Sequence, residues 1–305
     1  MAHPGAESAT RTVAFTGNMV ALVTPFRNGQ LDRAAFARLI ERVIDGGVSA
    51  IVPCGTTGES PTLSHDEHDE VVRLAVQAAA GRVTVIAGAG SNSTAEAVRL
   101  TRAAAENGAD AVLSVSPYYN KPTQEGLVRH FSTIADATDL PVVLYDIPGR
   151  CGVALAPDTV QRLAEHPRIR AIKVATGNVE DVSRITRSTG LAALSGDDSL
   201  TLPMLSLGAV GVISVISNLL PARMTRLVAA ALEGDYSVAR REHDALFPLM
   251  KAMFLESNPA PVKAALAKIG YLVDELRAPL VSVSPAARVA IESELAPFLD
   301  ELKLE

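Results

Sequence analysis

Short apolar runs alternate along the chain with longer stretches in which apolar residues recur every three or four positions. The short runs are typical of buried strands, and the longer stretches are typical of helices with one face packed inward. Eight strands are predicted, within Gly17–Phe26, Val48–Val52, Val83–Ala87, Ala111–Val115, Val142–Tyr145, Ile169–Gly177, Leu191–Leu194 and Val210–Ser214.

A helix is predicted after each strand, and several carry start or stop signals. Asp32 precedes the first helix, and Gly46 with Gly47 ends it. Serine followed three residues later by glutamate is a capping-box pattern, and it occurs at Ser64 and again at Ser93. These two helices are expected to run to about Ala80 and Asn107. The remaining helices are expected at 123–137, 157–164, 179–186, after Asp197-Asp198, and at 221–232.

This strict alternation predicts an α/β fold with parallel strands and right-handed crossovers. Eight units within residues 17–233 favour a closed (β/α)8 TIM barrel. A doubly wound open sheet is the main competitor, but no strand is followed by the G-x-G-x-x-G pattern of its commonest binding site.

The two ends of the chain differ from the barrel. Residues 1–16 are small and polar, so we expect a disordered tail rather than a signal peptide or a membrane span. Residues 234–305 have a helical pattern, and prolines such as Pro248 and Pro259 are expected to divide them into about three helices. We predict a C-terminal helical subdomain that packs on the barrel.

Composition excludes several classes of function. The chain has 34 acidic and 28 basic residues, a formal charge of -6 and no block of Lys or Arg, which does not support nucleic-acid binding. Cys54, Cys151 and six scattered histidines show no zinc spacing, so neither a metal nor a cofactor is predicted. Two cysteines cannot form a disulfide framework, which favours a soluble protein of the reducing cytoplasm.

Lys173 is the most informative single residue, because it lies in the apolar run I-R-A-I-K-V-A-T-G. Burial disfavours the ammonium form, so such a lysine either extends its head group to water, finds a partner, or has a lowered pKa. A lysine with a lowered pKa forms a Schiff base with ketones. The run alone favours the first outcome. Alternation along the strand turns Lys173 toward the barrel axis with Ala171 and Ala175.

Polar motifs follow several neighbouring strands, at the end of a barrel where active sites lie. Gly55–Glu59 is a run of backbone N–H and hydroxyl donors suited to a carboxylate or phosphate. Two adjacent tyrosines, Tyr118 and Tyr119, follow the fourth strand. After the fifth strand, Tyr145 is a candidate proton carrier and Arg150 a candidate carboxylate clamp. Each motif alone is weak evidence, but together they favour an enzyme active site that uses Lys173.

This combination resembles the dihydrodipicolinate synthase family, within the superfamily of pyruvate-dependent class I aldolases and N-acetylneuraminate lyases. The resemblance spans roughly residues 17–280. It is carried by V-T-P-F at Val23, G-T-T-G-E-S at Gly55, P-Y-Y-N-K-P at Pro117, Y-D-I-P-G-R at Tyr145, I-K-V-A-T-G at Ile172, S-G-D-D at Ser195, G-V-I-S-V at Gly211 and N-P-x-P-V-K at Asn258.

The resemblance implies a homotetrameric lyase that condenses pyruvate with L-aspartate 4-semialdehyde on the diaminopimelate and lysine pathway, without a metal. Lys173 would form the imine, and Tyr145 would relay protons with Thr57 and with Tyr119 of a neighbouring subunit. The roles implied for the remaining residues are pyruvate carboxylate binding by Thr56 and Thr57, semialdehyde carboxylate binding by Arg150, and shaping of the pocket by the main chain at Gly196 and Ile213.

The resemblance also implies a second site and includes some departures. Ser60, His65, His68, Asn92, Glu96 and Tyr118 match a feedback site for L-lysine at the tight-dimer interface of some family members. Ordinary helix-start chemistry is the alternative explanation for these residues. Among the departures, Asp146 stands where asparagine is frequent, and Val174 stands where an acid is common.

Two other functions remain open from the sequence. One is a lyase or aldolase of the same superfamily that acts on a sialic acid, a keto-deoxy sugar acid or hydroxy-oxoglutarate, although Arg150 argues against the sialic acid branch. The other is a non-catalytic barrel that binds pyruvate or lysine. Retention of Lys173, Tyr145, Thr57 and Tyr119 together disfavours a sensor, because binding alone needs no proton relay.

Overall fold

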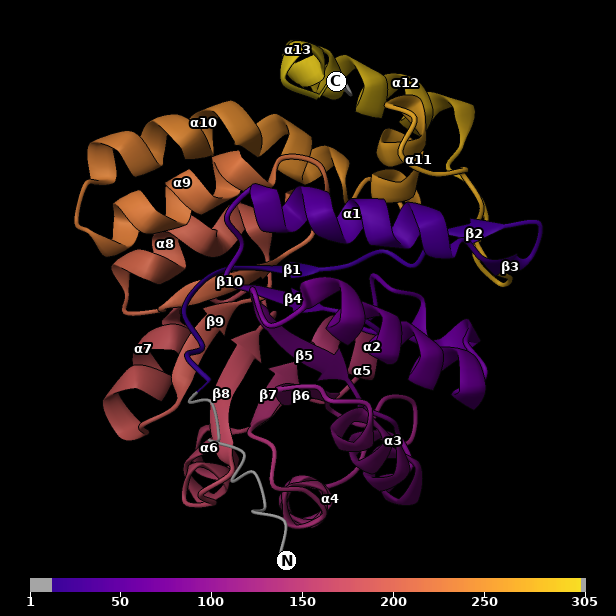
Figure 1. Ribbon diagram of the computed structural model, residues 1–305. Helices are drawn as coiled ribbons and strands as arrows, with labels where there is room; N and C mark the ends of the chain where they lie inside the picture. The colour runs from indigo at the N-terminus through magenta and orange to yellow at the C-terminus, as the bar shows by residue number, and fades with distance from the viewer. Residues whose placement is uncertain (1–12, 303–305) are drawn as a thin grey trace, which may run out of the picture.

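The computed structural model describes residues 13–302, and its centre is a closed barrel of eight parallel strands (Figure 1). β1 pairs with both β4 and β10, which closes the sheet. The predicted (β/α)8 barrel is therefore confirmed. The strands are β1 Gly17–Ala21, β4 Ala50–Val52, β5 Thr84–Gly88, β6 Ala111–Val115, β7 Val142–Asp146, β8 Ile169–Val174, β9 Ala192–Ser195 and β10 Gly211–Ser214.

Helices connect consecutive strands and form the outer ring. Asp32 caps α1 by accepting from the Ala35 N–H at 3.0 Å, and Ser64 and Glu67 form the predicted capping box. The helices of the ring are α1 Arg33–Asp45, α2 His65–Ala79, α3 Thr94–Glu106, α4 Gln124–Asp136, α6 Pro157–Ala164, α7 Glu180–Ser188, α8 Thr201–Ser206 and α9 Pro221–Leu232. A short helix, α5 Pro148–Cys151, lies in the loop after β7.

Alternate positions of each strand supply two separate apolar layers. Ile172 and Val174 of β8 face the ring of helices, whereas Ala171 packs inside the barrel with residues such as Leu194 and Ile213. Because side chains alternate across a strand, this pattern places Lys173 on the interior side with Ala171. The predicted orientation of Lys173 toward the barrel axis is confirmed.

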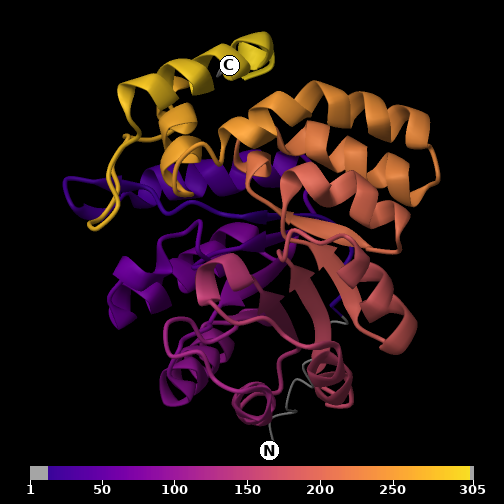
Figure 2. The ribbon, with the colours of Figure 1, turned by 180° about the vertical axis from the view of Figure 1, so that it is seen from behind.

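The C-terminal segment packs beside α1 and α9, as views from opposite sides show (Figures 1 and 2). Its helices are α10 Tyr236–Ala252, α11 Ala260–Lys268, α12 Pro285–Leu295 and α13 Leu299–Leu302. The expectation that Pro248 divides this segment is wrong, because α10 runs through it. Proline removes one helical hydrogen bond, but Leu246, Leu249 and Met250 are buried around it, and their burial holds the helix together.

A two-stranded hairpin, β2 Phe26–Arg27 and β3 Gln30–Leu31, follows β1 and was not predicted. Its turn is Asn28-Gly29, with φ of 54° and 76°, and Asn-Gly is the commonest signal for such a turn. The two turn N–H groups donate to the Glu275 carboxylate at 2.8 and 2.6 Å. The hairpin thus ties the first unit of the barrel to the C-terminal segment.

The expected N-terminal tail covers residues 1–16, of which 1–12 lie outside the described residues. Phe15 is buried with the barrel interior, and the Thr16 hydroxyl donates to the Val210 carbonyl at 2.8 Å. Ordered packing therefore begins before residue 17. The boundary near residue 233 stays a prediction, and hydrogen bonds cross it to the loop after β4, as described below.

Candidate active site

Lys173 and Tyr145 lie side by side near the C-terminal ends of β8 and β7. They are register partners in the sheet, and the Lys173 Nζ lies 4.3 Å from the centroid of the Tyr145 ring. Both side chains are buried, at 6% exposure each. Neighbouring positions on parallel strands direct their side chains to the same face, so amine and phenol share one compartment.

The amine of Lys173 has a pKa lowered to about 8, chiefly because burial penalises the ammonium form. The negative charge of Asp198 acts in the opposite direction, and the charge of Arg150 lowers the pKa further. With a pKa of 8, about a tenth of the amine is neutral at pH 7. The site therefore provides a nucleophilic amine near neutral pH, as imine formation requires.

Gly196 gives the Lys173 side chain its space. A Cβ at this position would lie 3.0 Å from the Lys173 Cε and 2.8 Å from the Ala175 Cβ. Ile213 is buried on β10 among the residues that fill the barrel interior. Of the two residues predicted to shape the pocket, Gly196 thus lies against the aliphatic part of Lys173, and Ile213 lies in the apolar layer inside the barrel.

Burial raises the pKa of the Tyr145 phenol to about 12, and the positive charge of Arg150 acts in the opposite direction. Thr56 lines the same cavity as Tyr145. The Thr57 hydroxyl instead accepts a hydrogen bond of 3.0 Å from the Asn258 side chain. The part of Thr57 in a proton relay, which the resemblance implies, stays a prediction.

Tyr119 does not join this group within its own chain. Its side chain is 89% exposed, and its backbone has φ of 73°, in the left-handed region that non-glycine residues rarely adopt. Tyr118, the adjacent residue, turns inward and lines the cavity. The two tyrosines therefore point to different surroundings.

Arg150 lies on α5, exposed at the mouth of the site. Its guanidinium donates to the carbonyl of Asn258 at 3.3 Å, and its other donors make no hydrogen bond within residues 13–302. Next to the tyrosine on β7, Asp146 is buried opposite Val174, and burial raises its pKa to about 7. Its carboxylate accepts from the Leu155 N–H at 3.3 Å.

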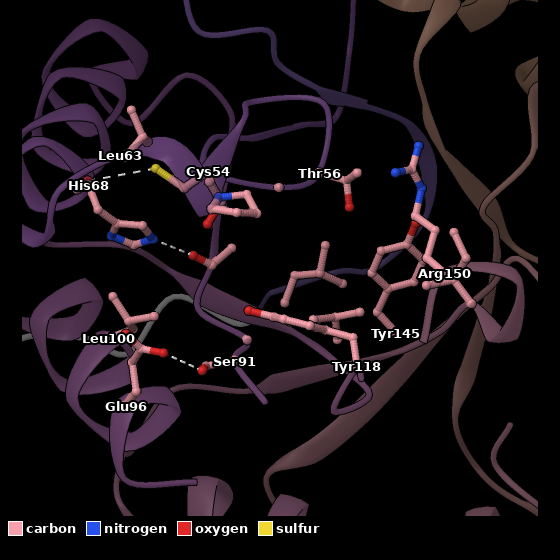
Figure 3. A pocket seen from close by; sticks show the side chains of 18 of the residues that line it. Cys54, Thr56, Leu63, His68, Ser91, Glu96, Leu100, Tyr118, Tyr145 and Arg150 are labelled. Atoms are coloured by element: carbon pink, nitrogen blue, oxygen red, sulfur yellow. Dashed lines mark hydrogen bonds between the residues drawn. The ribbon is translucent and has the colours of Figure 1, made fainter. Parts of the chain in front are cut away.

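A cavity of about 380 Å³ begins at these groups and extends toward the starts of α2 and α3. Figure 3 shows Thr56, Tyr145 and Arg150 at one end, His68 and Glu96 at the other, and Tyr118 between them. Its volume suits a small organic molecule. We call these the inner end and the outer end of the cavity.

The outer end contains the residues predicted to bind L-lysine, but two of them are already engaged. Glu96 accepts from Ser91 and contacts His65 at 3.0 Å, and these two hydrogen bonds hold the pKa of its carboxyl below the usual value. Its carboxylate therefore does not complete the capping box predicted at α3. His68 is buried and bonded to the Gly88 carbonyl at 2.8 Å, which makes it part of the wall.

Three further predicted residues lie close to this end. Ser60 lines the cavity with Tyr118. The Asn92 side chain donates to the Tyr118 carbonyl at 3.2 Å, so it fixes the backbone of the tyrosine pair. The structure thus gathers the predicted set around one part of the cavity.

Sequence motifs did not identify the residues that hold the loop after β4. Glu59 and Lys263 form an ion pair of 2.5 Å with both side chains fully buried, and the Glu59 carboxylate also accepts from the Arg277 N–H. The ring of Phe26 packs against the Lys263 amine and the Arg277 guanidinium, whose Nζ and Cζ atoms each lie 4.3 Å from the ring centroid. The available signals were a lysine inside an apolar helix and the N-P-x-P-V-K motif, but neither reveals its partner.

Two negative findings concern the described residues. Between residues 13 and 302, no group of three or more His, Cys, Asp or Glu side chains is arranged to hold a metal ion. In the same part of the chain, no helix combines the length and apolarity needed to cross a membrane.

The chain is similar to known proteins along most of its length. A model of the "Dihydrodipicolinate synthetase family" matches residues 14–297. A 4-hydroxy-tetrahydrodipicolinate synthase from Geobacter sulfurreducens is 53% identical, over 93% of this chain and 99% of that protein.

Solved structures agree. A chloride-inhibited dihydrodipicolinate synthase from Acinetobacter baumannii, complexed with pyruvate, is 43% identical, with a TM-score of 0.91 over 93% of this chain and 98% of that one. The enzyme from Cyanidioschyzon merolae with lysine bound is 42% identical, with a TM-score of 0.91 over 94% and 99%.

Proposed function

The chain belongs to the dihydrodipicolinate synthetase family, and we propose that it condenses pyruvate with L-aspartate 4-semialdehyde through an imine at Lys173. It is an enzyme of the lyase type with a role in lysine and diaminopimelate biosynthesis. The main support for imine formation is that the Lys173 amine is buried against the Tyr145 ring and that the pKa of this amine is lowered to about 8.

The proposed reaction begins when the neutral Nζ of Lys173 attacks the ketone carbon of pyruvate and water leaves. The resulting imine acidifies the methyl protons, and loss of one gives an enamine. The enamine carbon attacks the aldehyde carbon of the semialdehyde, whose oxygen takes up a proton. The amino group of the joined product then displaces Lys173 from the imine carbon, which closes the ring and releases the enzyme.

Protons must enter and leave at each of these steps, and we assign that work to Tyr145 with Thr56. Tyr145 and Thr56 line the same cavity, and the Lys173 amine lies 4.3 Å from the centroid of the Tyr145 ring. A phenol with a pKa raised to about 12 is protonated at neutral pH, so it is in the form that can donate a proton, and a hydroxyl chain can return the proton to it.

The two substrate carboxylates go to separate donors in this proposal. The main chain and hydroxyls at Thr56 and Thr57 take the carboxylate of pyruvate. The guanidinium of Arg150 at the mouth takes that of the semialdehyde, because its planar fork suits a bidentate carboxylate.

We assign Tyr119 to the active site of a neighbouring subunit. An aromatic side chain that is 89% exposed on a left-handed backbone is costly, and insertion into a partner offsets that cost. A second contact would complete a homotetramer, and exposed Tyr236 and Phe247 on α10 supply apolar surface for it. Sedimentation of the Tyr119→Ala variant, with its activity, tests the shared site.

We also propose that L-lysine inhibits by binding at the outer end, with Glu96 receiving an ammonium group. Its two present partners, Ser91 and His65, are groups that a lysine ligand would replace or join. An initial-rate assay with added lysine tests this, and rates unchanged at millimolar lysine contradict it. Cytoplasmic residence is proposed as well, since both cysteines are free and buried.

Borohydride reduction in the presence of pyruvate, followed by peptide mass mapping, tests the central step. The expected product is a pyruvate-derived adduct on Lys173, and an adduct on any other lysine contradicts the proposal. A coupled assay then compares aspartate semialdehyde with sugar-acid substrates. Turnover of the sugar acids alone would assign the chain to the aldolase branch of the superfamily.

A further inference from the structure

Asn258, between α10 and α11, contacts two residues to which the proposed function assigns the two substrates. Its Nδ2 donates to the Thr57 Oγ1 at 3.0 Å, and its backbone carbonyl accepts from Arg150 at 3.3 Å. Asn258 is 6% exposed and Thr57 3%, so the first bond is shielded from water. The side chain of Asn258 thus contacts the residue assigned to pyruvate, and its backbone carbonyl contacts the residue assigned to the semialdehyde.

The bond to Thr57 determines which role its hydroxyl plays. A threonine hydroxyl has one hydrogen to donate and two lone pairs that accept. Asn258 occupies a lone pair, and among residues 13–302 the Thr57 hydroxyl makes no other hydrogen bond. Its own hydrogen therefore remains free to be donated, which is what a carboxylate ligand requires.

Anchoring of the loop does not explain Asn258. The buried Glu59–Lys263 ion pair already joins the same loop to α11, two residues from Thr57. Moreover, the Oδ1 of Asn258 is buried without a hydrogen-bond partner in the described part of the chain. A buried unpaired acceptor destabilises the fold, so a residue retained only for stability would not be expected to carry one.

We propose that Asn258 is a positioning residue that keeps the Thr57 hydroxyl as a donor to the carboxylate of the first substrate, pyruvate. This inference rests on the proposed function. According to this inference, the Asn258 side chain affects the binding of pyruvate but not of the semialdehyde. The contact with Arg150 is made by the Asn258 backbone carbonyl, so it survives replacement of the side chain.

The first test measures half-saturation by pyruvate from the rate of borohydride trapping at Lys173, with no aldehyde present. Asn258→Ala is expected to raise it about ten-fold, as for loss of one charge-assisted hydrogen bond. The matched control is Asn107→Ala, which removes an asparagine bond to the Ala103 carbonyl on α3 and is expected to leave half-saturation unchanged. An unchanged value in Asn258→Ala overturns the inference.

The second test separates orientation of Thr57 from displacement of the loop. The KM for aspartate semialdehyde is expected to stay within about two-fold in Asn258→Ala, because the carbonyl that meets Arg150 remains. Equal increases for both substrates would mean that the segment had moved, and would refute a role through the side chain.

The third test is a double-mutant cycle. In a Thr57→Val background, Asn258→Ala is expected to leave the pyruvate concentration at half-saturation unchanged. In a Thr57→Ser background, which keeps the hydroxyl, Asn258→Ala is expected to raise that concentration about ten-fold, as it does in wild type. Additive effects in the valine background contradict the inference. If the wild-type enzyme forms no adduct at Lys173, the proposed function itself fails, which is a different outcome from an additive cycle.

Discussion

The two ends of the cavity differ in how far water reaches their ionisable groups. At the inner end, Tyr145 is buried and has the buried Lys173 amine against its ring. Burial disfavours the charged form of both groups, so it lowers the pKa of Lys173 and raises that of Tyr145. At the outer end, His65 and Glu96 keep about half of their side-chain surface exposed, and the Glu96 carboxyl has a lowered pKa. Burial thus favours the neutral forms of the groups at the inner end, whereas hydrogen bonds favour the charged form of the exposed carboxylate at the outer end.

Replacing the inner amine is expected to have the largest effect. Lys173→Met should lower turnover by at least about a thousand-fold, since no other group forms the imine. It should also raise stability at pH 7, by on the order of 1 to 3 kcal/mol, because a buried, partly charged amine is removed. Activity and urea unfolding of one preparation measure both. A lower free energy of unfolding in Lys173→Met than in wild type would contradict the view that burial of the charged lysine destabilises the fold.

Removing only the phenol hydroxyl tests the next group. Tyr145→Phe is expected to lower turnover about a hundred-fold by loss of proton transfer. Imine trapping at Lys173 with pyruvate should slow but still reach completion. Turnover close to wild type would remove Tyr145 from the relay.

Crowding the inner end should act through geometry alone. In Gly196→Ala the new Cβ meets the Lys173 Cε and the Ala175 Cβ within about 3 Å. Overpacking of this kind costs about 1 to 3 kcal/mol of stability, and displacement of the amine is expected to slow trapping roughly ten-fold. Gly149→Ala is the control, because a Cβ there meets nothing within 4 Å.

A pH series probes the buried acid beside the inner end. The pKa of Asp146 is raised to about 7 in the folded chain from 3.8, so its favourable contribution is complete below about pH 4 and is lost as pH rises through 7. Asp146→Asn should therefore gain stability over wild type between pH 5 and pH 8, by about 1 to 3 kcal/mol in urea unfolding. A constant difference would mean that the carboxyl is not buried as described.

The smallest effect is expected at the outer end. Glu96→Gln should raise the lysine concentration for half inhibition about ten-fold by removing a charged partner for the ammonium group, while pyruvate still forms its adduct at Lys173. Stability should change by less than about 1 kcal/mol, because the pair with His65 is exposed. Inhibition equal to that of wild type would place lysine elsewhere.

Much of the fold could be predicted because its signals are local. Apolar periodicity located the eight strands and their helices, and the Ser64 cap lies three residues from its partner. Errors arose where tertiary packing outweighed a local rule, as at Pro248. The hairpin at Asn28-Gly29 was missed although its turn signal is strong, because two-residue strands leave no periodicity to detect.

The site divides in the same way. The positions of Lys173, Tyr145 and Arg150 at the same end of the barrel could be predicted because each lies on or follows a strand, and parallel strands bring their ends together. The hydrogen bond that Thr57 accepts could not be predicted, because its donor, Asn258, is 201 residues away along the chain.

That separation has a consequence for how the enzyme is made. The loop after β4 leaves the ribosome early, but Thr57 and Glu59 meet their buried partners only when Asn258 and Lys263 have been synthesised. At about 5 to 20 residues per second the delay is roughly 10 to 40 seconds. A nascent chain that already contains all eight strands therefore still lacks the buried partners of this loop, and the loop can take its final contacts only after Lys263 has been synthesised.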